Sequence, residues 1–245
     1  MAVDAPPAVD ARVPVVDAGL RSCAAPASIT RVESAETGYG GSCIHGSWTL
    51  EALNGTTSPV AVGLPGNTAA VVPTALTMGQ NTVDSTSTFA VHVTGSGQQN
   101  TATGSSFAQL NAALNTISPT EFGVVDASAF TGIEFDAVVM TGPAGVRLTV
   151  ADLYTDPIGG QCSSTPTTDK SGCFDHPGAH LDISAAWKHY QVAFVDLTQL
   201  GFGLPSPVGA SFPKNAIVRI KWDLGIPPSD PTPAWELWVD NLAFY

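Results

Sequence analysis

Glu134 and Asp136 are the residues whose types and spacing come nearest to catalytic chemistry. They lie two positions apart in the stretch IEFDAV, which has the apolar alternation of a β-strand. Residues i and i+2 of a strand share one face about 6.6 Å apart, near the lower end of the separation that the carboxylate pair of an inverting glycosidase uses. The spacing alone therefore leaves acid–base chemistry on a sugar open.

Other catalytic patterns are weaker in this sequence. In glucanases that carry E-x-D-x-x-E on one strand, a third acid is the general acid, but Val139 stands in that place. The stretches GSGQQ and GSS lack the G-x-S-x-G turn of serine hydrolases, and the five histidines do not form H-E-x-x-H. We expect the chain not to be an enzyme. The alternative is a polysaccharide-active enzyme that uses Glu134 and Asp136.

The four cysteines indicate an oxidising compartment, because an even number can pair completely. Four cysteines allow three connectivities, and we expect Cys23–Cys43 and Cys162–Cys173, which close short loops. Zinc is the competing interpretation, but the sequence has no C-x2-C spacing. The second pair brackets a small polar loop, which is followed by Asp175, His176 and a proline.

The elements that must position these residues are strands. Segments rich in β-branched and aromatic residues, bounded by Gly, Pro, Ser or Asp, predict strands at 46–53, 87–95, 131–139, 145–154, 179–184, 188–197, 216–224 and 235–245. The stretch 105–118 fits either a short helix or a strand. We predict an all-β fold, a two-sheet antiparallel β-sandwich of the jelly-roll type.

Alternation along four of these strands points polar side chains away from the core. The chain has only nine Lys and Arg residues, and three of them, Arg147, Arg219 and Lys221, belong to this outward set. The other outward residues are Glu134, Asp136, Thr149, His189, Gln191 and Asp223. A solvated sheet face is the ordinary explanation. Opposite charges held on neighbouring strands also suit the hydroxyl groups of a sugar, which need donors and acceptors in fixed positions.

Charge and hydropathy exclude several partners. The net charge is −12 and 12% of residues are charged, so we expect no nucleic acid partner and no attraction to anionic membranes. No apolar run is long enough to span a bilayer. Residues 1–28 read as a Pro/Ala/Asp-rich linker and residues 29–245 as one domain. The linker is similar in composition to spacers of bacterial surface lipoproteins, which implies a lipid anchor upstream.

The order of several motifs resembles a carbohydrate-binding module of the galactose-binding-like jelly-roll class. The stretches that carry it are DASAFTGIEFDA, VRLTVADLYT, CFDHPG, AAWKHYQVAFVDLTQLGFG, AIVRIKWDL and WELWVDNLAFY. The resemblance implies a concave sheet face that binds glycans through Glu134, Asp136, Arg147, Thr149, Gln191, Arg219 and Lys221. It places Tyr154, Asp175, His176 and His189 at the rim.

The same resemblance implies a structural calcium ion. Asp240 matches an acid in the final strand of such modules, and Glu33 or Glu36 is the candidate for the acid near the first strand. Carboxylates and backbone carbonyls are the ligands that Ca²⁺ prefers. The alternative is that Asp240 caps the strand end and Glu33 is solvated.

These inferences converge on a functional expectation. We expect a secreted or surface-anchored bacterial protein, a monomer, that binds a polysaccharide or oligosaccharide without cleaving it. A second alternative is an adhesin or scaffold module that binds another protein through the same polar face.

Overall fold

The structure is a computed structural model, and it describes residues 21–22, 27–28, 38–40, 45–53, 60–63, 75–79, 90–95, 107–118, 121–142, 145–165, 170–224 and 235–245. Cys23, Cys43, Glu33 and Glu36 lie outside the described residues. The expected Cys23–Cys43 disulfide and the first-strand calcium ligand therefore remain predictions.

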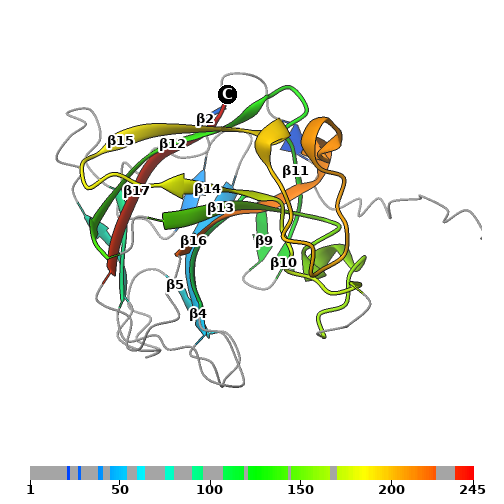
Figure 1. Cartoon of the computed structure of the whole chain (residues 1–245), viewed down its shortest axis with the longest axis horizontal. Helices are drawn as coiled ribbons and strands as arrows, with labels where there is room; N and C mark the ends of the chain where they lie inside the picture. The colour runs from blue at the N-terminus through cyan, green and yellow to red at the C-terminus, as the bar shows by residue number, and fades with distance from the viewer. Residues whose placement is uncertain are drawn as a thin grey trace, which may run out of the picture.

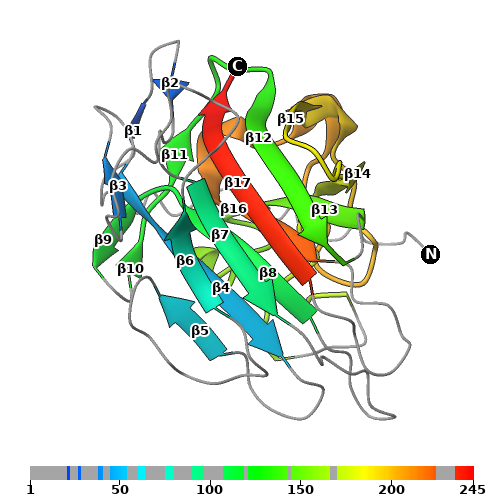
Figure 2. The ribbon, with the colours of Figure 1, turned by 90° about the vertical axis from the view of Figure 1, so that its left-hand side faces the viewer.

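The described strands form two large sheets (Figures 1 and 2). The nine-stranded sheet has the order β1-β11-β16-β8-β4-β3, with β13 and β14 continuing from β16 and β5 pairing with β4. Its strands are β1 Arg21–Ser22, β3 Gly38–Gly40, β4 His45–Leu53, β5 Val60–Gly63, β8 Phe107–Ala113, β11 Val125–Asp126, β13 Gly145–Asp152, β14 Gly178–Asp182 and β16 Ile217–Leu224.

The six-stranded sheet has the order β15-β12-β17-β7-β6, and β2 pairs with β17. Figure 2 looks onto this sheet, with β17 in red between β12 and β7. Its strands are β2 Ala27–Ser28, β6 Ala75–Gly79, β7 Ala90–Gly95, β12 Gly132–Thr141, β15 Lys188–Ala193 and β17 Trp235–Phe244. A separate pair is formed by β9 Thr116–Ser118 and β10 Glu121–Phe122.

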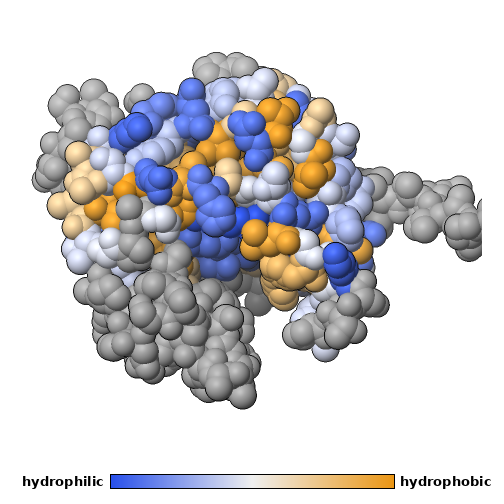
Figure 3. Space-filling view, in the orientation of Figure 1, coloured by the Kyte–Doolittle hydropathy of each residue, from blue (hydrophilic) through white to orange (hydrophobic). Residues whose placement is uncertain are grey.

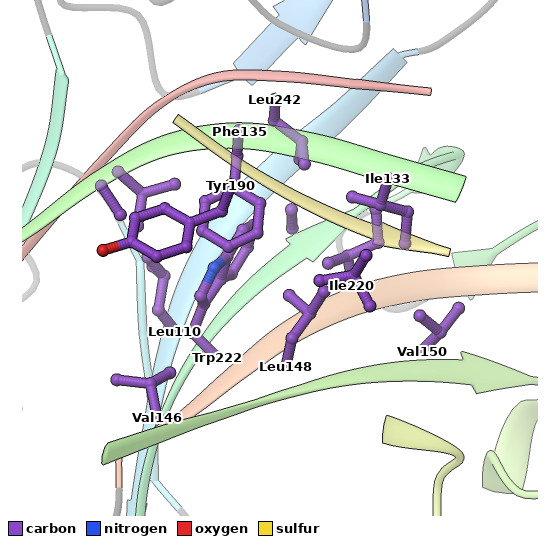
Figure 4. Close-up of a cluster of buried hydrophobic side chains, with 14 of the residues drawn as sticks. Leu110, Ile133, Phe135, Val146, Leu148, Val150, Tyr190, Ile220, Trp222 and Leu242 are labelled. Atoms are coloured by element: carbon purple, nitrogen blue, oxygen red, sulfur yellow. The ribbon is translucent and has the colours of Figure 1, made fainter. Parts of the chain in front are cut away.

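The core lies between the two sheets. Ile133 and Phe135 of β12 point toward Leu148 of β13 and toward Ile220 and Trp222 of β16 (Figure 4), and all five side chains are fully buried. The Phe135 ring meets the Trp222 ring edge to face at a centroid distance of 5.3 Å, a favourable geometry for aromatic pairs. Burying these apolar faces stabilises the sandwich.

The predicted all-β sandwich of the jelly-roll type is confirmed. Each strand predicted from the sequence is present with small shifts at its ends, and apart from β1 and β11 the described strand pairs are antiparallel. Residues 105–118, which the sequence left open, contain the strands β8 and β9. The strand predicted over 188–197 is too long: β15 ends at Ala193, where the chain turns into the 3-10 helix η2 Phe194–Asp196. Phe194 is nevertheless buried, as alternation predicted.

Helical structure in the described part of the chain is confined to 3-10 turns. Besides η2, these are η1 Pro157–Gly159, η3 Gly209–Ser211 and η4 Lys214–Ala216. Within the described residues, no helix is long and apolar enough to cross a membrane.

Candidate functional site

The polar residues expected to share one concave face lie on the outer faces of two different sheets. Glu134 and Asp136 on β12 pair with Gln191 and His189 on β15, in the six-stranded sheet. The other four belong to the nine-stranded sheet, on β13 and β16: Arg147, Thr149, Arg219 and Lys221. The core separates the two sets, so the expectation of a single array was wrong. Alternation identifies which side of a strand a residue occupies, but it does not say which sheet the strand joins.

On the outer face of the six-stranded sheet the polar side chains bind one another. Gln191 Nε2 donates to Glu134 Oε2 at 2.9 Å, and His189 Nδ1 lies 2.9 Å from Asp136 Oδ1. Asn241 Nδ2 donates to the other oxygen of Asp136 at 2.7 Å. Both acids predicted to do chemistry or to bind sugar are therefore occupied by protein partners.

On the outer face of the nine-stranded sheet, polar side chains stand in two rows that cross the strands. In the first row, Thr149 on β13 pairs with Lys221 on β16, which pairs with Asn111 on β8. In the second row, Arg147 pairs with Asp223, which pairs with Gln109. We call these residues the polar floor: Gln109, Asn111, Arg147, Thr149, Lys221 and Asp223.

The two rows differ in exposure. Asn111, Thr149 and Lys221 are buried, with exposed fractions of 1%, 1% and 3%. Gln109, Arg147 and Asp223 are partly exposed. Figure 3 shows hydrophilic residues gathered in the centre of the view, over β13, β14 and β16, where the surface is hollowed. The second row therefore forms the accessible part of the polar floor, and the first row lies deeper.

Arg147 is fixed by backbone carbonyls at the edge of the polar floor. Its Nη2 donates to the carbonyl oxygens of His176 at 3.1 Å and Thr198 at 2.7 Å. The other guanidinium N–H groups have no hydrogen-bond partner among the described residues. Burial lowers the pKa of Arg147, against the attraction of Asp223 and Asp175. Because the ordinary pKa of an arginine is so high, the side chain stays charged. Its remaining guanidinium N–H groups are available as donors to a ligand.

Several polar atoms of the floor lack a well-aligned partner. Asn111 Oδ1, Thr149 Oγ1 and Asp223 Oδ1 are buried and have no well-aligned hydrogen bond among the described residues. Burial raises the pKa of Asp223, opposed by the nearby charges of Lys221 and Arg147 and, to a smaller extent, by hydrogen-bonding contact with Thr149 and Gln109. A buried polar atom without a partner costs about 1–3 kcal/mol, so a group of them at one surface marks a place where water or ligand hydroxyls complete the bonding.

Arg219 lies on β16 beside the polar floor but is engaged elsewhere. Its Nε lies 2.9 Å from Asp156 Oδ2, and its guanidinium carbon lies 5.1 Å from the centre of the Phe122 ring. The Asp156 side chain is 3% exposed. Arg219 is therefore tied into the body of the protein rather than offered to a ligand.

The predicted Cys162–Cys173 disulfide is confirmed, with Cα atoms 4.9 Å apart. The loop that it closes is followed by Asp175 and His176, both buried at 1% and 2% exposure. Asp175 accepts four backbone N–H groups, from Leu200, Gly201, Phe202 and Gly203. Its carboxylate therefore organises a neighbouring loop rather than standing free at a rim.

His176 is held neutral in one tautomer. Thr155 Oγ1 donates to Asp152 Oδ1 at 3.1 Å, so it accepts from His176 Nδ1, 2.9 Å away. This leaves Nε2 as an acceptor, which is buried and has no hydrogen-bond partner in the described part of the chain. Burial lowers the pKa of His176 well below its usual value, and the positive charges of Lys221, Arg219 and Arg147 lower it further. Tyr154, in the preceding turn, is partly exposed.

Asp240 pairs across strands with Asp136 and is fully buried. Its Oδ1 accepts the backbone N–H of Asn241 at 2.8 Å. Asn241 has a φ of 51°, which marks the bulge between β17 and β12. Within the described part of the chain no three His, Cys, Asp or Glu side chains gather as a metal site. Calcium at Asp240 remains a prediction, since its expected partners are not described.

Sequence reasoning missed Gln109 and Asn111. Both come from the stretch 105–118, which was open between helix and strand. Had FAQLNAA been assigned as a strand, its alternation would have placed Phe107, Gln109 and Asn111 on one side and Ala108 and Leu110 on the other. The buried Ala108 and Leu110 face the core, which leaves Gln109 and Asn111 outside.

Comparison with family models finds no match, and comparison with curated proteins finds none. Among solved structures, a family 11 carbohydrate-binding module of a cellulosomal cellulase of Clostridium thermocellum is 12% identical, over 80% of this chain and 86% of that one, with a TM-score of 0.44. The same family in complex with a β-1,3-1,4-mixed-linked tetrasaccharide is 13% identical, over 80% and 95% of the two chains, with a TM-score of 0.41.

An exo-β-agarase is 12% identical over 89% of this chain and 24% of that one, with a TM-score of 0.48. Solved structures similar to this chain thus include carbohydrate-binding modules and part of an agarase, and the β-sandwich fits them. Carbohydrate-binding modules, the class of protein that the sequence resembles, are thus among the solved structures found.

Proposed function

We propose that this protein binds a glycan chain at the polar floor of the nine-stranded sheet. The observation that carries the proposal is a set of buried polar atoms that lack a well-aligned hydrogen bond among the described residues, Asn111 Oδ1, Thr149 Oγ1 and Asp223 Oδ1. Beside them stand guanidinium donors of Arg147 that no described residue uses. Hydroxyl groups both donate and accept, so a sugar can satisfy such a mixed set directly or through a bridging water.

The dimensions of the accessible row favour a chain over a single sugar. His180 on β14 is exposed and pairs with Arg147, so the row His180–Arg147–Asp223–Gln109 crosses four strands. Neighbouring strands lie about 4.8 Å apart, which gives the row a length of about 14 Å. That length accommodates more than one sugar ring. The ligand class is therefore an oligosaccharide or polysaccharide.

The proposed activity is binding without cleavage. Glycoside hydrolysis uses two carboxyl groups that flank one bond, whereas the polar floor as defined contains one, Asp223. Glu134 and Asp136 lie on the other sheet and are bound to Gln191, His189 and Asn241. The test is incubation with soluble glucans and xylans and a search for new reducing ends. Release that disappears in Glu134→Gln would overturn this part of the proposal.

We also propose an oxidising location, secreted or at the cell surface. The Cys162–Cys173 disulfide supports it, because disulfides persist in such compartments. Attachment through a lipid upstream of residues 1–28 is part of the same proposal, and radiolabelled fatty acid incorporation in the native host tests it. Calcium bound by Asp240 would raise the melting temperature, and a chelator would then lower it.

A glycan array tests the proposed function. We expect wild-type protein to bind a polysaccharide or a set of related oligosaccharides, and Asp223→Asn to lose at least tenfold in affinity. A hydrogen bond to a charged group contributes about 1.5–3 kcal/mol, which corresponds to this change. Glu236→Gln, an acid on β17 of the other sheet, is the matched control and should bind as wild type does. Binding to no glycan, with specific binding to a protein partner instead, would favour the adhesin alternative.

A further inference from the structure

Three large apolar side chains are exposed on two neighbouring loops. Phe174, Leu200 and Phe202 are 52%, 63% and 55% exposed. The two loops touch through Asp175, which follows Phe174 in sequence and accepts the backbone N–H groups of Leu200 and Phe202 at 2.9 Å each. We call these three residues the apolar rim. Exposed apolar side chains gathered in one place mark a binding surface more often than scattered ones do.

The loop that carries Leu200 and Phe202 is held in one conformation. Gly201 and Gly203 donate to Asp175 Oδ2 at 2.7 and 3.1 Å. Gly201 has a φ of 91°, a backbone conformation that residues other than glycine rarely adopt. A Cβ on Gly203 would lie 2.6 Å from Asp175 Cβ, so only glycine permits this close approach. The two apolar side chains are thus presented on rigid backbone.

The loop that carries Phe174 is braced from the other side. Cys173 is bonded to Cys162, and the backbone N–H of Phe174 donates to the carbonyl of Thr155 at 2.8 Å. Phe174 has a φ of 77°, a left-handed conformation that is costly for an aromatic residue and is held by its surroundings. The strained backbone keeps the ring outside the protein, where it is half exposed.

The apolar rim adjoins the polar floor. The Phe174 ring lies 6.4 Å from the His176 ring, edge to face. The carbonyl of His176 accepts a hydrogen bond from Arg147, a residue of the accessible row. An apolar edge and a row of hydrogen-bonding groups therefore stand side by side, and Figure 3 shows hydrophobic residues bordering the hydrophilic centre.

We propose that the apolar rim contacts the C–H face of a sugar ring whose hydroxyl groups bind the polar floor. This inference rests on the proposed function and adds the apolar side of the same site. A pyranose ring is amphiphilic, with hydroxyl groups around its edge and C–H groups on its faces. Ligand sites combine apolar and aromatic contact area with a few placed polar groups, and the rim and floor together supply both.

Asp175 is a positioning residue in this account. It touches no ligand, but its four hydrogen bonds from residues 200–203 set where Leu200 and Phe202 stand relative to Phe174. Asp175→Asn removes the charge and replaces one of the two acceptor oxygens with an NH2 group, while the side chain keeps its size. We expect it to weaken glycan binding as the rim variants do, and addition of a second change, Phe202→Ser, to weaken it little further.

Affinity electrophoresis in gels cast with soluble glucan, xylan or galactomannan tests the rim. We expect Phe174→Ser and Phe202→Ser each to lower the association constant about tenfold, and Phe202→Trp to retain it. The matched controls are Met140→Ser and Val195→Ser, which remove side chains of 58% and 59% exposure outside the rim and should leave binding unchanged. Melting temperatures of all four serine variants should stay near wild type, because each side chain is exposed.

The outcomes separate the rim from the floor. If Asp223→Asn weakens binding and both Phe variants bind as wild type does, the rim proposal is wrong and the floor stands. If no gel retards the wild type, the proposed function fails and the rim fails with it. If sedimentation shows a wild-type dimer that Phe202→Ser converts to a monomer with glycan binding intact, the rim is a self-association surface instead.

Discussion

The two outer faces of the sandwich carry similar polar residues in opposite bonding states. On the six-stranded sheet, Glu134 and Asp136 have hydrogen-bonded partners from neighbouring strands. On the nine-stranded sheet, Asn111 Oδ1, Thr149 Oγ1 and Asp223 Oδ1 have no well-aligned hydrogen bond among the described residues. Polar side chains that satisfy one another stabilise a solvated face, whereas unsatisfied ones at a hollowed surface need a ligand or water. Composition alone could not have distinguished the two faces.

Removal of the Cys162–Cys173 disulfide should have the largest effect, on both stability and glycan affinity. The double variant Cys162→Ser/Cys173→Ser loses about 3 kcal/mol of unfolding free energy in the chain-entropy model, since the bond closes a short loop. Because this loop leads into Phe174 and His176 beside the polar floor, glycan affinity should fall as well. Chemical denaturation and affinity electrophoresis measure the two effects. Lower stability with unchanged affinity would show that the loop does not contribute to glycan binding.

Acid should also destabilise the protein, through His176 beside the polar floor. The pKa of His176 is well below its usual value in the folded protein, so the unfolded chain binds more protons as the pH falls below about 6.5. Stability is therefore present above that pH and is lost on acidification, by up to about 1.4 kcal/mol between pH 7.5 and 5.5. Burial raises the pKa values of Asp152 and Asp223. In the pH range where these two acids titrate, acidification therefore stabilises the folded protein, which is opposite in sign to the effect of His176.

Thermal denaturation of His176→Gln at several pH values isolates that contribution. In the variant, stability should no longer fall between about pH 7.5 and 5.5 through this histidine. Asp152 and Asp223 contribute equally to the stability of both proteins, so they cancel in the comparison. An identical slope in wild type and His176→Gln would show that His176 is not a buried neutral group.

The smallest effect is expected on the six-stranded face. Gln191→Ala removes the side chain that donates to Glu134 Oε2, and the partly exposed acid then takes water as its partner. The expected loss of unfolding free energy is below about 1 kcal/mol, because exposed hydrogen bonds exchange easily with solvent. Glycan affinity should not change. A loss of affinity comparable to that of Asp223→Asn would show that the six-stranded face also takes part in glycan binding.

The sequence predicted the sandwich and most strands because alternation and turn residues are local signals. It also predicted the outward orientation of Glu134, Asp136, Arg147 and Lys221 correctly. It could not assign these residues to the right sheets, since strand partners are set by contacts between distant segments. Nor did it reveal that Asp175 is consumed by backbone N–H groups, because residues 200–203 come 25 or more positions later and carry no matching motif.

The most direct test of the account is a paired calorimetric titration of Arg147→Ala and Asp136→Ala with a glycan that binds the wild type. Arg147 offers unused donors at the polar floor, and Asp136 is bonded to His189 and Asn241 on the opposite face. We predict that Arg147→Ala weakens binding at least tenfold and that Asp136→Ala changes it less than twofold, with both variants folded by circular dichroism. Strong weakening in Asp136→Ala with none in Arg147→Ala would contradict the account.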